Sequence, residues 1–336
     1  MTFYGFPNTI SPIIKKERLP FIDKACGITI LLVAYGHIMF PETMGLSWYR
    51  TSNMFVYRFH MPLFMCLSGY LAFLSTTNRN IVSRNDFWSF QKKKLRKFLP
   101  AYVFFSVISV SVDVFYHNAT IEETKGFIYS FFFSPGTGSA VFVWYLYILM
   151  GFYVITPFLL NLRTNSQCLL VAFGLLLTNS SFATLSIADL FCKYFFFFLS
   201  GGLIYRNSNE FISFLERRGK WIVLFTLFLA TLDVFTQFAM PYQVLCLAVI
   251  PSVLYISNLK WPRIFSESCT VMGMSSFAIY LLNTSVINSY YIVFKLFLKI
   301  EVGTFFIFSC LLLCIAVSIL VRATFNRVIP IRIYAL

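Results

Sequence analysis

Charged residues are scarce in this chain: Asp, Glu, Lys and Arg make up only 12% of it, whereas soluble domains contain about 25%. Hydrophobic residues account for 58% of the sequence and aromatic residues for 20%. So much apolar surface could not stay dissolved in water, which excludes ordinary soluble enzymes, disordered proteins and nucleic-acid-binding modules. Eight cysteines in 336 residues are too few for a small disulfide scaffold. The composition is that of an integral membrane protein.

Acidic residues are rarer than basic ones, with 13 Asp and Glu against 27 Lys and Arg, and the net charge is +14. In a soluble protein this excess would suggest a nucleic-acid partner. In a membrane protein it marks the loops that stay in the cytoplasm, so we predict no nucleic-acid partner. Histidine occurs only three times, and no zinc-type spacing of His, Cys or carboxylates is present. We therefore predict no metal site.

Long apolar runs are abundant, and a membrane-crossing helix needs about 20 mostly apolar residues. The candidate segments are Phe21–Phe40, Met54–Leu74, Phe98–Phe115, Val141–Leu160, Gln167–Leu185, Ala188–Tyr205, Trp221–Phe238, Tyr242–Asn258, Thr270–Phe294 and Gly303–Arg322. Strands of a membrane β-barrel would be about ten residues long and would alternate in polarity. We therefore predict an all-α, polytopic bundle of about ten transmembrane helices that forms a single domain, residues 1–336.

The distribution of Lys and Arg predicts the orientation of this bundle. With the N-terminus inside, the inner segments carry 21 of the 27 basic residues, and seven of these lie within residues 78–97. We therefore predict that both termini are cytoplasmic, with residues 1–20 and 323–336 as the terminal inner segments. The first 20 residues lack an apolar core, so we expect no signal peptide.

Ionisable groups inside a bilayer are costly, so each is a candidate functional residue. His37 falls near the outer end of the first predicted helix, and His60 falls roughly 9 Å below the outer surface in the second, at 1.5 Å per residue. Two antiparallel neighbours would bring both imidazoles to a similar depth, with Arg58 just above His60. This arrangement suits acyl transfer, because a neutral His can take a proton from a hydroxyl and a cation can stabilise an oxyanion. Alternatively, the two histidines are polar groups that join helices, and His117 is a surface residue of an outer loop.

The basic segment 78–97 also favours two interpretations. Ser83 or Asn85 is placed to cap a helix that leads through aromatic residues to the lysines. Such a helix would lie at the inner interface, with its aromatic side chains in the lipid. It would anchor the protein and attract anionic lipids, and its cations would also suit the phosphate groups of a ligand. The two roles are compatible.

Several other polar or aromatic residues are candidates for an acceptor site. Trp144 and Tyr145, at the outer start of the fourth span, suit stacking on a sugar ring or an aromatic belt at the membrane interface. Asp113, Asp189 and Asp233 suit an acceptor site near the outer face or internal ion pairs. The sequence alone does not choose between these roles.

An ordered set of motifs is distributed along the chain. Its segments are Asp23–Ile28 with the apolar run to Gly36–His37, Phe59–Phe64 with Leu67–Leu71, Lys92–Lys97 with Phe98–Tyr102, Val143–Leu146, Phe198–Gly201 and Ser276–Leu282. In this order they resemble the integral-membrane acyltransferase-3 family. Together they run over nearly the whole chain. No single motif is decisive, and the specificity lies in their order and in the number of spans.

The resemblance implies an enzyme that moves an acyl group, commonly acetyl, from cytoplasmic acyl-CoA to a hydroxyl of a surface glycan. By this analogy His37 matches the catalytic histidine of the first helix. Lys94 and Lys97 match a cytoplasmic pair that is usually two arginines, so we assign donor binding to Lys94, Arg96 and Lys97. The resemblance also implies a multi-pass protein of the bacterial cytoplasmic membrane, with acetyl-CoA as co-substrate and no tightly bound cofactor.

Three positions depart from the family pattern. Cys26 stands eleven residues before His37, where the family typically has Arg or Lys; the two positions share a helix face, with Asp23 near the same stripe. Lys24 reaching from the helix start is a candidate replacement for the missing cation, and Cys26 is either an acyl carrier or a small apolar filler. Lysines in place of the arginine pair lose bidentate phosphate geometry. Asn283 stands where the late helix often carries His.

We therefore expect a membrane O-acyltransferase, most simply an O-acetyltransferase of a bacterial surface carbohydrate or its lipid-linked precursor. His37 would act as general base, with Arg58 or His60 stabilising charge; a covalent acyl-enzyme is an alternative. A transporter or flippase of a lipid-linked sugar or small anion would predict paired half-sequences with broken helices, which we do not find. A catalytically inactive relative that serves as an assembly partner is a third possibility.

Overall fold

The computed structural model describes residues 19–79, 81, 83–116, 119–134, 141–179, 186–236 and 240–328. Within these residues every regular element is a helix, which confirms the all-α prediction. Five helices are long and apolar enough to cross a membrane: Ser47–Thr77, Arg84–Phe115, Ile187–Arg206, Ser276–Lys295 and Thr304–Arg327. Three shorter apolar helices are Trp144–Leu160, Thr164–Leu177 and Tyr242–Asn258. The total of about ten spans and the side of the termini stay predictions.

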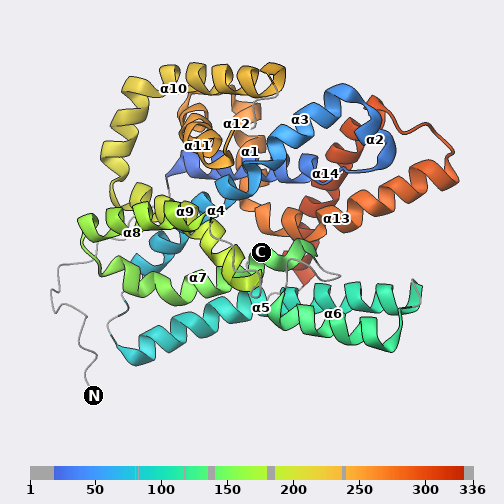
Figure 1. Cartoon of the computed structure of the whole chain (residues 1–336), viewed down its shortest axis with the longest axis horizontal. Helices are drawn as coiled ribbons and strands as arrows, with labels where there is room; N and C mark the ends of the chain where they lie inside the picture. Colours follow the sequence, from blue (N-terminus) through green and yellow to red (C-terminus); the bar gives the residue numbers. More distant parts are fainter. Residues whose placement is uncertain are drawn as a thin grey trace. The chain divides into compact units, whose positions relative to one another are not determined.

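The described chain divides into two compact units, Ser68–Arg206 (unit 1) and Leu19–Leu67 with Asn207–Val328 (unit 2). Unit 1 contains the second half of α4 (His60–Thr77) and the following helices (Figure 1). These are α5 (Arg84–Tyr116), α6 (Ile121–Phe133), η1 (Val141–Val143), α7 (Trp144–Leu160), α8 (Thr164–Leu177) and α9 (Ser186–Arg206). α8 packs along α9, and α5 packs against both α6 and α7.

The basic segment and the third predicted span form one continuous helix, α5, rather than an interfacial helix followed by a separate span. Ser83 caps it: the Asp86 amide donates to Ser83 Oγ at 3.1 Å, and the Ser83 amide donates to Asp86 Oδ2 at 2.9 Å. Pro100 lies inside α5. A proline removes only one backbone donor, and membrane helices tolerate this loss because neighbouring groups compensate.

Unit 2 contains the first and last parts of the described chain. Its helices are α1 (Pro20–Gly36), α2 (Pro41–Gly45), α3 (Ser47–Tyr57), the start of α4, α10 (Ser208–Thr236), α11 (Tyr242–Asn258), α12 (Arg263–Met274), α13 (Ser276–Ile292), η2 (Val293–Phe297) and α14 (Thr304–Val328). Two predicted spans are interrupted: Met54–Leu74 at Arg58, and Thr270–Phe294 at Ser275.

Small residues allow α1 and α12 to approach closely. A Cβ added to Gly27 on α1 would overlap the backbone carbonyl of Cys269, and one added to Gly273 on α12 would overlap that of Asp23. Glycine at both contact points lets the two backbones touch, which is how membrane helices gain packing energy without a hydrophobic driving force. The Gly27–Gly273 crossing therefore sets the position of α1 in unit 2.

The short helix α2 is fixed to α13 and η2 by one aromatic contact and two polar contacts. The ring of Phe40 stacks on Tyr291 at 3.9 Å between centroids, with the planes 4° apart. Beside it, Glu42 forms an ion pair with Lys295 and accepts a hydrogen bond from the Tyr291 hydroxyl at 3.1 Å. The Lys295 ammonium holds the pKa of Glu42 below its ordinary value. These contacts hold the segment that leads from α1 into α3.

Candidate active site

His60 begins α4, directly after the turn at Arg58 and Phe59 that ends α3. Its side chain is buried, and Nδ1 lies 3.0 Å from the backbone oxygen of Val56. Because a carbonyl oxygen only accepts hydrogen bonds, this contact assigns a proton to Nδ1, and in a neutral ring the lone pair is then on Nε2. The turn between α3 and α4 therefore presents His60 Nε2 as a proton acceptor.

His37 lies beside His60, directly after the last turn of α1. The two ring centroids are 6.3 Å apart, with the planes at 82°. Tyr57 joins them: its ring lies 4.9 Å from that of His60 and 6.4 Å from that of His37. Gly36 borders the same edge, because a Cβ built there would lie 3.9 Å from His60 Nε2. The structure thus brings the two predicted histidines together and adds a tyrosine; we call these three residues the histidine cluster.

Two buried polar side chains of α3 hold the last turn of α1. Asn53 Nδ2 donates to the backbone oxygens of Tyr35 and Gly36 at 3.3 and 3.2 Å. The Tyr49 hydroxyl donates to the Tyr35 oxygen at 2.7 Å. These carbonyls lie where α1 ends and would otherwise lack helical partners. The backbone leading into His37 is therefore fixed by α3, the same helix whose last turn anchors His60.

Arg58, the third predicted catalytic residue, uses its guanidinium in another contact. It forms an ion pair with Asp233 on α10 and donates to the backbone oxygen of Met240. The side chains of Arg58 and Asp233 are 27% and 12% exposed. Since a largely buried charge depends on its partner, this pair joins α3 to α10. The oxyanion role of Arg58 stays a prediction. Asp233 was predicted to belong either to an acceptor site or to an internal ion pair, and the structure shows it in an ion pair.

Cys26 and Asp23 lie far from His37 along α1. Although Cys26 and His37 share a face, eleven residues of helix separate them by about 16 Å along the axis. Cys26 is buried at 2% exposure. Lys24 reaches the end of α11, where its Nζ donates to the backbone oxygen of Leu259 at 3.1 Å. Lys24 therefore satisfies a helix C-terminus, and its replacement of the family's usual cation beside Cys26 stays a prediction.

Lys94 on α5 turns toward α4 and α7 within unit 1. Its Nζ donates to Ser75 Oγ at 3.1 Å and lies 4.1 Å from the centroid of the Tyr153 ring. Tyr153 is held in turn by Gln91, whose Nε2 donates to its backbone oxygen at 3.0 Å. The ring face and the hydroxyl oxygen both attract an ammonium group. Lys94, Ser75 and Tyr153, here called the lysine cluster, thus hold one cation at a defined position.

Arg96 lies on a different face of α5 from Lys94. Residues two apart on a helix are separated by about 200° around its axis. Arg96 is exposed and, with Lys92, borders a cavity along the outside of α5. Lys97 is half-buried and three residues from Lys94, so these two are neighbours on the helix surface. The structure therefore groups two of the three predicted donor-binding residues and separates the third.

Trp144 and Tyr145 at the start of α7 are both engaged within unit 1. Tyr145 is buried at 3% exposure, and its hydroxyl shares a hydrogen bond with Ser68 Oγ. Trp144 stacks on Tyr194 at 4.8 Å between centroids, with the planes 27° apart. These contacts give both rings a packing role. That they also bind an acceptor stays a prediction.

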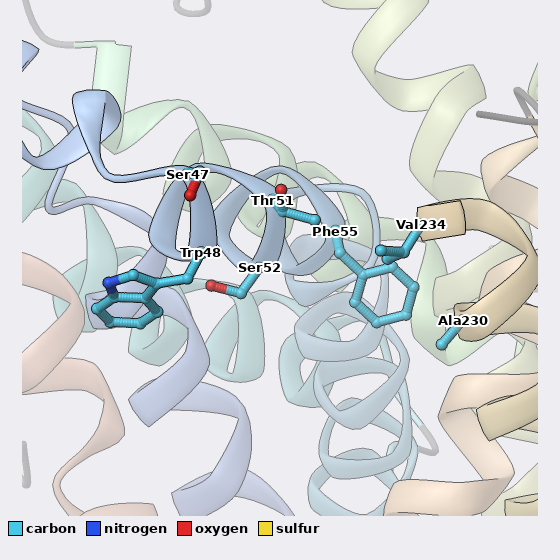
Figure 2. Close-up of a pocket in the computed structure, with 7 residues that line it drawn as sticks. All are labelled: Ser47, Trp48, Thr51, Ser52, Phe55, Ala230 and Val234. Carbon is cyan, nitrogen blue, oxygen red and sulfur yellow. The ribbon is translucent and has the colours of Figure 1, made fainter. Parts of the chain in front are cut away.

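A cavity of about 450 Å³ lies between α3 and α10 in unit 2 (Figure 2). It is lined by Ser47, Trp48, Thr51, Ser52, Phe55, Ala230 and Val234. The ring of Phe55 points toward the two α10 residues (Figure 2). Tyr57 is two residues beyond Phe55 and therefore lies on the other side of α3. The cavity is thus separated by the α3 helix from the histidine cluster and is no evident site for a hydroxyl that reacts there.

Two further residues bear on the site. Tyr57 was not among the sequence candidates. Its position three residues before His60, within one predicted span, was the available signal, because residues three apart on a helix are neighbours. Asn283, where the family often has His, is buried and satisfied locally. It donates to the Tyr280 oxygen and accepts from Thr284 Oγ1, both at 2.9 Å. Among the described residues no group of His, Cys, Asp or Glu is arranged to hold a metal ion.

Comparison with known proteins identifies the family. No curated protein and no solved structure matches the chain. A family model described as an acyltransferase domain, Acyl_transf_3, matches residues 19–322. The matched range begins before α1 and ends within α14, so it includes every residue of the histidine and lysine clusters. Since the match covers most of the sequence, the chain belongs to the acyltransferase-3 family of membrane proteins, as its ordered motifs predicted.

Proposed function

We propose that this protein is a membrane O-acyltransferase that transfers acetyl from cytoplasmic acetyl-CoA to a hydroxyl of a bacterial surface glycan or its lipid-linked precursor. Membership of the family supports acyl transfer in general. The observation that supports a catalytic site is the hydrogen bond between His60 Nδ1 and Val56, which leaves an unprotonated Nε2 beside His37. Donor, acceptor and the bacterial cytoplasmic membrane remain parts of the proposal.

The geometry favours His60 as the general base, whereas the sequence had favoured His37. His60 Nε2 would take the proton of the acceptor hydroxyl as its oxygen attacks the thioester carbonyl. Collapse of the tetrahedral intermediate would then form the ester and release CoA as a thiolate, which recovers that proton. His37 and Tyr57 lie close enough to contact the hydroxyl or the developing oxyanion. Arg58 is less suited to this role because its Nη1 and Nη2 already donate to Asp233 and to the Met240 oxygen.

The lysine cluster is the proposed contact for the acyl donor. A CoA-type donor carries several phosphates, and Lys94 holds a fixed cation near half-buried Lys97. Neither lysine offers the paired donors of an arginine, so phosphate binding here would rely on charge and position. Arg96 contributes less to this proposal because it lies on a different face of α5.

The deciding experiment supplies radiolabelled acetyl-CoA and a lipid-linked glycan extract to the purified chain in detergent. We expect ester-linked label on the glycan together with release of free CoA. His37→Ala should reduce transfer strongly, whereas His117→Ala, at the third histidine, is the matched control. If the wild type transfers no acetyl group and releases no CoA with any acceptor, the enzyme assignment fails. Glycan movement across vesicles without acetylation would then favour the transporter.

Cys26→Arg tests the remaining alternative, an inactive relative. This substitution restores the cation that the family typically has at that position. If the wild type is active and the variant is no more active, the chain has compensated for the change. If only the variant transfers acetyl, the natural sequence is catalytically inactive and serves another role.

A further inference from the structure

Helix α5 divides its cations between two faces. Lys94 points into unit 1, where Ser75 and Tyr153 hold it. Lys92 and Arg96 are exposed. They are four residues apart and therefore adjacent on the helix surface, and Lys94 lies about 200° around the axis from each. This exposed pair is thus distinct from the lysine cluster assigned to the acyl donor.

The exposed pair stands at one end of an apolar groove. A cavity of about 490 Å³ contacts Trp88, Lys92, Leu95, Arg96, Leu99 and Pro100. A second cavity, of about 570 Å³, is lined by Leu99, Pro100, Val103, Phe104, Val107 and Ile108. Because the cavities share Leu99 and Pro100, they form one continuous depression along α5, which we call the α5 groove. None of its lining residues is acidic.

We propose that the α5 groove binds one anionic phospholipid of the bilayer, with its phosphate between Lys92 and Arg96 and one acyl chain along Leu99–Ile108. The charge of the two cations complements a phosphate, and the rest of the groove complements a hydrocarbon chain. The lengths also agree: the ten residues of Leu99–Ile108 rise about 14 Å from first to last, and an acyl chain spans half of a hydrocarbon core of about 30 Å.

Trp88 supports the depth at which this lipid would lie. It lines the charged end of the groove and is exposed. Tryptophan is enriched at the level of the lipid headgroups, where its ring is in lipid and its N–H meets water. The cations are in the segment that the distribution of Lys and Arg predicts to be cytoplasmic, and anionic lipids concentrate in that leaflet. A neutral lipid or an apolar partner helix would leave the cation pair without a counter-charge.

The test titrates the full chain, in neutral detergent, with phosphatidylglycerol or phosphatidylcholine and counts bound lipid by native mass spectrometry. We expect one phosphatidylglycerol to bind more tightly than phosphatidylcholine. Lys92→Gln/Arg96→Gln should weaken phosphatidylglycerol binding about 30-fold, since each cation near an anionic lipid contributes measurably. The matched control is Arg84→Gln/Lys93→Gln, which also removes two exposed charges of α5 but none that lines the groove.

Three outcomes would overturn the proposal. Equal binding of the two lipids would show only general solvation of the helix. Equal weakening in the control would show diffuse charge rather than a site, and competition by millimolar inorganic phosphate would show that the apolar groove does not take part. If the double variant fails to fold, Lys92→Gln and Arg96→Gln are tested singly, each with an expected weakening of about fivefold. None of these readings depends on acyltransferase activity.

Discussion

The histidine cluster of unit 2 and the lysine cluster of unit 1 each hold a basic nitrogen beside a tyrosine ring, but their anchors differ. His60 donates from Nδ1 to the Val56 carbonyl, which leaves a lone pair on Nε2. Lys94 donates to Ser75 Oγ and rests on the face of Tyr153, so it presents only N–H donors and charge. A carbonyl anchor leaves the second nitrogen of a neutral imidazole as a proton acceptor, whereas a hydroxyl and a ring face fix the position of a lysine amine.

We therefore expect the two clusters to have different functions. The histidine cluster is suited to moving a proton, and the lysine cluster to binding an anion. Changes in the first should lower kcat, and changes in the second should raise the KM of the donor. The following experiments test whether the two clusters affect kcat and KM separately.

The largest effect is expected at His60. His60→Gln removes the proton acceptor while keeping a polar side chain of similar size. Acetyl transfer should fall about 1,000-fold in kcat, with little change in the KM of acetyl-CoA. Steady-state kinetics with His117→Gln as control checks this. A variant that keeps more than a tenth of the wild-type kcat would show that His60 is not the base.

The ion pair of Arg58 should matter for stability more than for chemistry. Arg58→Gln leaves Asp233 as an uncompensated, largely buried charge and should destabilise unit 2 by about 3 kcal/mol. Arg58→Met/Asp233→Leu removes both charges and should recover most of the loss. Thermal unfolding measures the stability, and acetyl transfer is assayed on the same samples. A double variant that folds normally but is inactive would indicate that Arg58 is a catalytic residue after all.

The two glycines of α1 should behave differently when a methyl group is added. In Gly27→Ala the new methyl would overlap the Cys269 carbonyl, so α1 and α12 must separate, at a cost of about 2 kcal/mol. In Gly36→Ala the methyl meets Tyr57 and His60 only at 3.6 to 3.9 Å, which is ordinary contact. We therefore expect a lower Tm for the first and an unchanged Tm for the second. Equal Tm values would show that the close crossing is not needed.

The smallest of these effects is expected at the lysine cluster. Lys94→Gln should raise the KM of acetyl-CoA about tenfold and leave kcat nearly unchanged, as expected for loss of one charge-assisted contact. Lys93→Gln, an exposed neighbour on the same helix, serves as the control. A fall in kcat without a change in KM would assign Lys94 to the chemical step and remove the distinction between the clusters.

Much of this arrangement could be read from the sequence, for identifiable reasons. Apolar runs predicted the helices, and the depth of His37 and His60 on consecutive antiparallel segments predicted their proximity. Ser83 was one of two predicted caps, and the structure shows it accepting the Asp86 amide at the start of α5. These features depend on short-range periodicity or on helix length, which a sequence displays directly.

Other features depend on contacts between distant segments or on small changes in helix direction. Arg58 and Asp233 are 175 residues apart, and no local pattern pairs them. The turn before His60, which places the ring against the Val56 oxygen, lies within a run that reads as one continuous span. Helical periodicity places Arg96 and Lys94 on different faces of a helix. This prediction needed the knowledge that the basic segment is part of one continuous helix, α5.

The central claim is that His60 carries its proton on Nδ1 and presents an unprotonated Nε2. With only three histidines in the chain, ¹⁵N NMR of the histidine-labelled protein at neutral pH measures this directly, and His60→Gln assigns the signals. We expect a neutral His60 ring with a protonated Nδ1 and an unprotonated Nε2. A ring protonated at Nε2 alone, or at both nitrogens, would contradict the assignment of His60 as the base.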